Sequence, residues 1–232
     1  QDRIIFVWML VYEHFAGIIS AAKTPSPLVE KAIVCLLLLC VKLVHTDEIT
    51  DRILRCLKLF LKLEAPVADA MSESIAIAVD RLLQSKPPCI IDTPKGAKVV
   101  FRLLARCPLY AQARQRGFKA LVQLIDEPGQ PALTSITYSH IVNVLVAFAS
   151  ANDTSDFEQK LSVFSIKYIY RLFELIPQIT SRDPVLSLHV ENISSSPDPI
   201  SAATPAGSLQ SPSLDQEWKK YWFPLFAAFK SL

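Results

Sequence analysis

The sequence predicts an all-α protein, an α-solenoid of HEAT/armadillo-like helical pairs. Only 5 of the 232 residues are glycine and 51% are apolar, a composition that favours long helices over strands and turns. Apolar residues recur at helical spacing along most of the sequence. Successive helical pairs are predicted to begin near Leu28, Pro66, Leu109 and Phe157. Their spacing of about 38 to 49 residues is close to the HEAT and armadillo period of roughly 40–47 residues. A compact helical bundle is the alternative.

The first two predicted helices span Gln1–Ser20 and Leu28–Val44, and Pro27 suits the first turn of the second. The second helix is apolar almost all the way round, but its apolar run is shorter than the roughly 20 residues that cross a bilayer. Such a helix must be covered by protein on most sides. We therefore expect it to lie inside the stack, with Leu38 enclosed.

Six further helical patterns follow, several of them bounded by proline. A helix ending near Leu63 is expected to be capped by Thr46 or Asp47, and Thr93 is expected to cap a later one. The other predicted helices cover residues 65–84, 95–106, 109–125, 133–149 and 157–176.

The composition divides the sequence into three parts. Residues 1–178 form the predicted helical-repeat domain. Residues 179–215 are rich in Ser and Pro and are predicted to be a disordered linker. Residues 216–232 begin a further helical block with an aromatic-rich pattern, which we expect to be truncated. The sequence starts without Met and stops inside this pattern, so we expect it to be part of a longer protein.

The five cysteines are odd in number, form no CxxC motif and lie mostly in apolar helical patterns. They are therefore predicted to be buried thiols in a reducing compartment. The catalytic motifs HExxH, GxSxG, GxGxxG and the Walker loop are absent, and the four histidines are far apart. These observations predict no catalytic, cofactor-binding or metal site, although a Cys–His pair formed by distant residues stays open at this level.

Two basic stripes are the candidate binding residues. One follows the helix that ends near Leu63, and the other lies on the helix of residues 95–106. Such a stripe indicates contact with an anionic lipid surface or an acidic partner, and an ordinary solvated helix face is the alternative. The members are Arg52, Arg55, Lys58, Lys62, Lys95, Lys98, Arg102 and Arg106.

Two further features lie near the C-terminal end of the sequence. Ser196, Thr204 and Ser211 each precede a proline and are candidate phosphorylation sites. An aromatic cluster runs from Trp218 to Phe229 and is interpreted as the core face of a helix, with an exposed interaction patch as the alternative.

Several segments resemble a known family. They are Leu28–Leu37 (LVEKAIVCLL) with Val41–Val44 and Asp47–Thr50, then Ala76–Lys86 (AIAVDRLLQSK), Ala97–Leu104 (AKVVFRLL) and Trp218–Phe226 (WKKYWFPLF). In this order they resemble the region downstream of the catalytic domain in large Arf guanine-nucleotide exchange factors, of the Golgi-specific brefeldin A-resistance factor and Gea subgroup.

The resemblance implies an α-helical, armadillo-like segment C-terminal to the exchange domain. The family's catalytic domain and its glutamate finger have no counterpart here, so the segment itself is expected not to be an enzyme and to need no cofactor. Its implied role is regulation and membrane recruitment in vesicle transport. The implied location is cytoplasmic, peripheral to Golgi membranes.

The expected partners of the parent protein are Arf- or Rab-family small GTPases and an anionic Golgi membrane, with a homodimer as a further candidate. The net charge of +2 gives no reason to expect nucleic acid. A generic α-solenoid scaffold that binds another protein, with no membrane role, is the alternative function.

Overall fold

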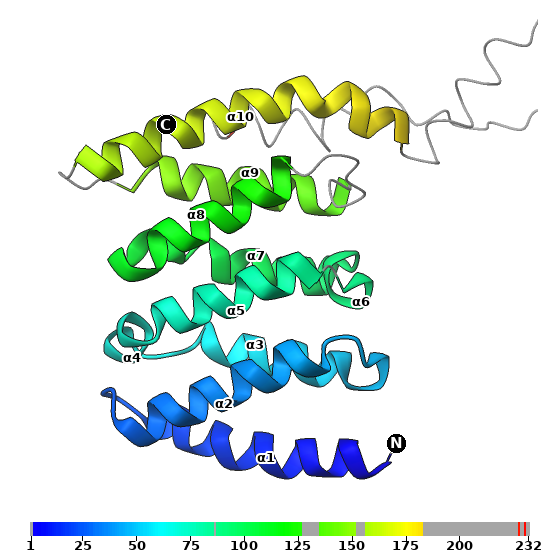
Figure 1. Ribbon diagram of the computed structural model, residues 1–232, viewed down its shortest axis with the longest axis vertical. Coiled ribbons are helices and arrows are strands. Elements are labelled where there is room, and N and C mark those ends of the chain that lie inside the picture. Colours follow the sequence, from blue (N-terminus) through cyan, green and yellow to red (C-terminus); the bar gives the residue numbers. More distant parts are fainter. Residues whose placement is uncertain are drawn as a thin grey trace, which may run out of the picture.

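The computed structural model describes residues 2–85, 87–126, 135–151 and 156–182, together with Ala227 and Lys230. This part of the protein is helical and contains no strand. Figure 1 shows the helices stacked one above another along the long axis, from α1 at one end to α10 at the other. The prediction of an all-α protein is confirmed for the described residues.

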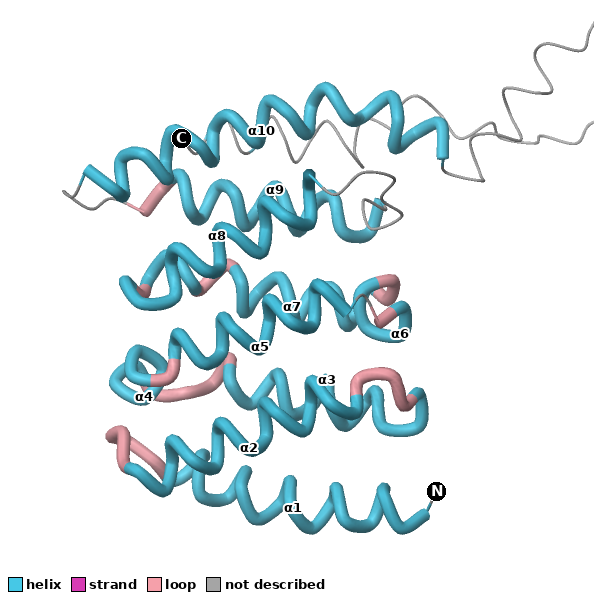
Figure 2. Tube along the Cα trace, in the orientation of Figure 1, coloured by secondary structure: helices cyan, strands magenta, loops and turns pink. Residues whose placement is uncertain are grey.

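Short loops and turns join the described helices from α1 to α5 and from α6 to α8, as Figure 2 shows. Two 3₁₀ turns, Asp47–Ile49 and Cys107–Leu109, precede α3 and α8. The α-helices are α1 Asp2–Ala21, α2 Pro27–Leu43, α3 Thr50–Phe60, α4 Ala65–Ala70, α5 Ser72–Ser85, α6 Pro88–Ile91, α7 Pro94–Leu104, α8 Ala111–Asp126, α9 Ser135–Ala149 and α10 Asp156–Arg182.

The longer helices form two layers. The first layer contains α1, α3, α7 and α9, and each of these contacts the next one in the layer. The second layer contains α2, α5, α8 and α10, which contact one another in the same way. The backbone alternates between the layers, so that α3 and α7 become neighbours although α4, α5 and α6 separate them in sequence.

One apolar core runs between the layers. In α2 its members recur at helical spacing, and Ile33, Leu36 and Cys40 are fully buried. The opposite side of α2 is uncovered by the described residues, and Leu38 is 46% exposed there. Leu28 and Val34 are exposed as well. The prediction that Leu38 is enclosed is wrong, because α2 packs on the core with its other side and the side that carries Leu38 faces away from the core.

The predicted ends of the helices are confirmed at some positions and wrong at others. Pro27 does occupy the first turn of α2, and Thr93 caps α7 by accepting a hydrogen bond from the Gly96 amide. Neither Thr46 nor Asp47 caps α3, because the 3₁₀ turn makes Ile49 the residue before that helix. The pattern of residues 65–84 is two helices, α4 and α5, which meet at Met71. The last described helix continues to Arg182, past the predicted end at residue 176.

The prediction of buried thiols is confirmed for three of the five cysteines. Cys40, Cys56 and Cys107 are buried, and burial raises the pKa of Cys107 to about 12. Cys89 is half-buried, and Cys35 is exposed on the uncovered side of α2, where the prediction is wrong. All five are free thiols.

Candidate functional site

The two predicted basic stripes face one another across a groove in the first layer. On the α3 side, Arg55 and Lys58 lie on the helix and Lys62 lies in the turn that follows it, at spacings of three and four residues. On α7, Lys95, Lys98 and Arg102 repeat the same spacing. This spacing places each set on one side of its helix. Because α3 packs against α7, the two rows border the same surface.

This basic groove has a volume of about 670 Å³ and is open to solvent. Six of its ten lining residues are the cations of the two rows, and none is acidic. The other four are Tyr12, Leu59, Leu61 and Val99. The groove therefore combines a strongly positive border with apolar and aromatic surface, which is the composition of a binding surface for an amphiphilic anion.

The basic pattern in the sequence does not identify the other four residues that line the groove, which are Tyr12, Leu59, Leu61 and Val99. Tyr12 comes from α1 and reaches the groove because α1 packs on α3. Burial raises the pKa of Tyr12, so its phenol stays protonated and can donate a hydrogen bond at neutral pH. Val99 follows Lys98 directly, so its position next to a basic residue is a local signal in the sequence. No local signal would have found Tyr12.

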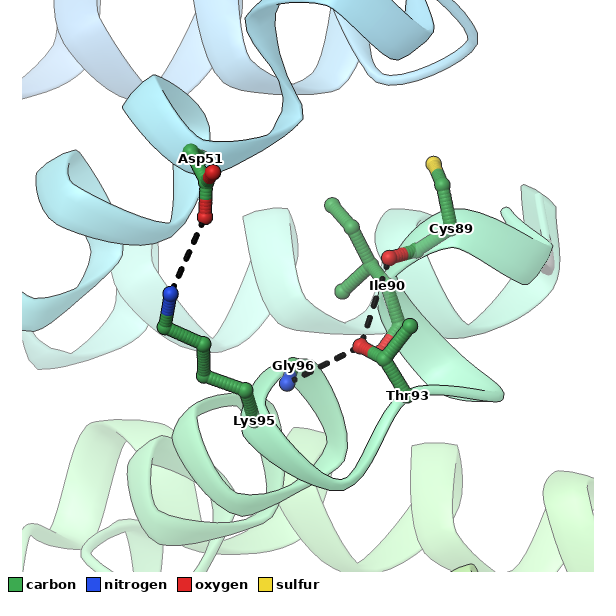
Figure 3. Close-up of polar contacts among 6 residues, drawn as sticks. All are labelled: Asp51, Cys89, Ile90, Thr93, Lys95 and Gly96. Carbon is green, nitrogen blue, oxygen red and sulfur yellow. Dashed lines mark hydrogen bonds and ion pairs between the residues drawn. The ribbon is translucent and has the colours of Figure 1, made fainter.

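One acidic side chain meets the rows. The Nζ of Lys95 lies 3.1 Å from the Oδ1 of Asp51 on α3, and both side chains are largely exposed (Figure 3). Within the described part of the protein, Arg55, Lys58, Lys62, Lys98 and Arg102 make no hydrogen bond or ion pair. Most of the positive charge at the groove is thus free to meet an external anion.

A local hydrogen-bond network holds the start of α7, the helix that carries Lys95, against α6. The Thr93 hydroxyl accepts a hydrogen bond from the Gly96 amide at 3.2 Å and donates to the carbonyl oxygens of Cys89 and Ile90 (Figure 3). This network joins α6 to the first turn of α7, from which Lys95 projects toward Asp51. The network therefore fixes the first turn of the helix that carries the α7 row.

Two of the predicted basic residues do not line the groove. The guanidinium of Arg106 is half-buried and donates a hydrogen bond of 2.8 Å to the carbonyl oxygen of Leu61. Arg106 therefore stabilises the turn that follows α3. Arg52 is also half-buried, and its guanidinium lies 3.9 Å from the sulfur of Met9 on α1.

The positive field of the α7 row extends to α9. The imidazole of His140 stacks on Phe101 with ring centroids 6.0 Å apart. Burial lowers the pKa of His140, and the nearby charges of Lys98 and Arg102 lower it further. This histidine is therefore neutral at physiological pH and adds no charge to the rows.

Other candidate features lie outside the described residues. Ser196, Thr204 and Ser211 do, as do the Ser- and Pro-rich segment beyond Arg182 and the aromatic cluster around Trp218. In the described ranges no three His, Cys, Asp or Glu side chains are gathered in a way that could hold a metal ion. None of the described helices is both long and apolar enough to pass through a membrane.

Comparison with known proteins relates the sequence to Arf exchange factors. It is 38% identical over 128 residues to the ARF guanine-nucleotide exchange factor GNL1 of Arabidopsis thaliana, and to the same extent to the ARF guanine-nucleotide exchange factor GNOM of that plant. The matched region is 55% of this chain but only 9% of each relative. No protein-family profile and no solved structure matches the sequence. The similarity therefore supports a segment related to ARF guanine-nucleotide exchange factors.

Proposed function

We propose that this protein is a non-catalytic regulatory segment of an Arf guanine-nucleotide exchange factor, and that it helps to recruit the exchange factor to an anionic Golgi membrane. The sequence similarity over 128 residues supports the connection to exchange factors. The observation that carries the recruitment role is the pair of basic rows on α3 and α7, since five of their six cations have no partner in the described part of the protein.

The same proposal includes the architecture and the position of the segment. The alternation of the backbone between two layers is typical of an α-solenoid of HEAT or armadillo pairs, in which each pair buries its apolar face on the next. The resemblance of Leu28–Leu37 and Ala97–Leu104 to segments downstream of the exchange domain supports a position after that domain in the parent protein. Arf- or Rab-family GTPases would then meet the parent protein on or beside this segment.

The number of unpaired cations in the groove determines how strongly it can attract an anionic membrane. A basic side chain near an anionic membrane contributes about 1 kcal/mol of binding free energy. Five unpaired cations within one groove can therefore give measurable attachment that weakens as the salt concentration rises. Lys58 and Lys98, one from each row, are exposed and make no described contact, so they can be changed without disturbing the core.

Flotation of this 232-residue protein with phosphatidylserine-containing vesicles tests the proposal. We expect the wild-type protein to float with these vesicles, and an activated Arf or Rab GTPase on them to increase the bound fraction. The Lys58→Glu/Lys98→Glu variant should lose most of the binding. The control matched in charge is Lys42→Glu/Lys119→Glu, which changes two exposed lysines on α2 and α8 in the second layer and should keep the binding. Absence of vesicle binding by the wild-type protein, with or without GTPase, would favour a protein-binding scaffold instead.

A further inference from the structure

We propose that the basic groove binds a short acidic peptide segment of a partner protein in an extended conformation, with an apolar or aromatic side chain of that peptide against Tyr12, Leu59 and Leu61. This inference rests on the proposed function only because both use the basic groove as a contact surface. A bound peptide would occupy the basic side chains that contact a membrane, so it would also regulate membrane binding.

The dimensions of the groove set the length of the peptide. Seven residues of an α-helix span about 10 Å, which is the length of each basic row. Packed helices lie about 8–10 Å apart, which sets the separation of the rows. An extended peptide rises about 3.3 Å per residue, so three to four of its residues fill the length of the groove.

The two-sided arrangement of charge fits an extended peptide. Successive side chains of such a peptide point to opposite sides. Acidic residues in a run would therefore alternate between the α3 row of Arg55, Lys58 and Lys62 and the α7 row of Lys98 and Arg102. A peptide chain is also narrow enough to enter the hollow between the rows, where it can contact the residues that line the groove as well as the cations at its border.

The apolar residues that line the groove favour a peptide that also carries an apolar side chain. Val99 is buried in the groove wall, while Leu59 and Leu61 are half-buried and so keep surface that a ligand can cover. Burying apolar surface contributes about 25 cal/mol per Å². The protonated phenol of Tyr12 can donate to a peptide carbonyl or carboxylate. These contacts favour a peptide that carries a hydrophobic side chain among its acidic residues over a polyanion without one.

Lys95 is the position at which the groove is partly neutralised. Its ammonium already pairs with Asp51 at 3.1 Å, so an acidic peptide gains least at this end. The strongest contacts are expected toward Lys58, Lys62, Lys98 and Arg102, which lie farther along the two rows.

Fluorescence anisotropy with a defined probe tests the inference in the absence of any membrane. The probe is a short dye-labelled peptide with acidic residues on both sides of a central phenylalanine. We expect the full-length wild-type protein to bind it. The same peptide with amides in place of carboxylates, and the peptide with serine in place of phenylalanine, should each bind at least about tenfold more weakly.

Variants of the protein locate the site. Lys58→Glu/Lys98→Glu should weaken binding of the acidic peptide by about tenfold or more, whereas Lys42→Glu/Lys119→Glu, the same change of charge on α2 and α8, should leave it within about twofold. Circular dichroism and thermal melting of each variant would establish that the fold is retained. The inference is overturned if the wild-type protein does not bind the peptide, if the phenylalanine has no effect, or if the two charge reversals act equally.

Competition with vesicles separates the two proposals. Peptide binding without any vesicle binding would leave this inference standing and remove the membrane proposal. Vesicle binding without peptide binding would do the reverse, and the groove would then serve a lipid surface. If both bind, the peptide should displace the protein from phosphatidylserine-containing vesicles, because both need the same cations.

Discussion

Lys95 on α7 and Asp51 on α3 form an ion pair of 3.1 Å across the two helices that border the basic groove. Since the two side chains are 65% and 79% exposed, we expect the pair to contribute less than about 1 kcal/mol to the free energy of unfolding. Asp51→Asn should therefore leave a denaturant melt almost unchanged. The same change frees the charge of Lys95, so binding of an anionic ligand in the groove should become stronger. Weaker anion binding in Asp51→Asn would contradict this account of Lys95.

Gly96 in the first turn of α7 has no room for a side chain. A Cβ atom there would overlap the carbonyl oxygen of Ile90 and lie 2.8 Å from the Ile90 carbonyl carbon and from the Thr93 hydroxyl. We expect Gly96→Ala to destabilise the protein by about 1–3 kcal/mol, measured by urea denaturation. Gly17→Ala is the matched control, because nothing lies within 4 Å of a Cβ at that position in α1. There the better helix propensity of alanine should stabilise the protein by roughly 0.5–1 kcal/mol. Equal effects of the two substitutions would mean that the turn between α6 and α7 adjusts freely.

Leu36 and Leu38 in α2 provide a test of the exposed side of that helix. Leu36 is fully buried, and Leu36→Ala should cost about 2–5 kcal/mol of unfolding free energy. Leu38 is 46% exposed, and Leu38→Ala should cost less than about 1 kcal/mol. Denaturant melts of both variants give the comparison. A loss at Leu38 as large as that at Leu36 would show that this side of α2 is covered in solution.

His140 on α9 should titrate below the usual imidazole pKa of about 6.5. Burial and the charges of Lys98 and Arg102 disfavour the protonated form in the folded protein. Neutral His140 therefore belongs to the stable state above about pH 6.5. As the pH falls from that value toward the lower folded pKa, the unfolded state takes up the proton first and stability decreases.

An NMR titration of the His140 imidazole measures this pKa directly. Melting temperatures between about pH 7.5 and 5.5, compared with those of His140→Asn, would show the contribution of this residue to acid sensitivity. Removing positive charge with Lys98→Gln should raise the pKa of His140. A value at or above about 6.5 in the wild-type protein would contradict the described position of the ring.

The parts of the fold that depend on local chemistry could be predicted from the sequence. Thr93 caps α7 because its hydroxyl, the following proline and the helix start are all within a few residues, and Pro27 opens α2 for similar reasons. The two basic rows could also be predicted, since a helical period is enough to place Lys58 and Lys98 on their own helix faces.

What the sequence did not show depends on packing between distant segments. The rows face each other only because α3 packs on α7, and Tyr12 joins them because α1 packs on α3. Leu38 was expected to be enclosed because an apolar helix usually is. Its exposure follows from the side of α2 that faces away from the core, and an almost uniformly apolar helix sequence does not determine which side that is.

The seam between α3 and α7 is also the joint between two successive steps of the stack. In a structure whose helices contact mainly their immediate neighbours, stiffness is set joint by joint. Like-charged rows on the two sides of this joint repel each other, so the joint is held closed less strongly than one lined by neutral side chains. An anion bound between the rows reduces this repulsion and contacts both α3 and α7. We therefore expect a ligand in the groove to change how easily the stack bends at this joint, without altering any helix.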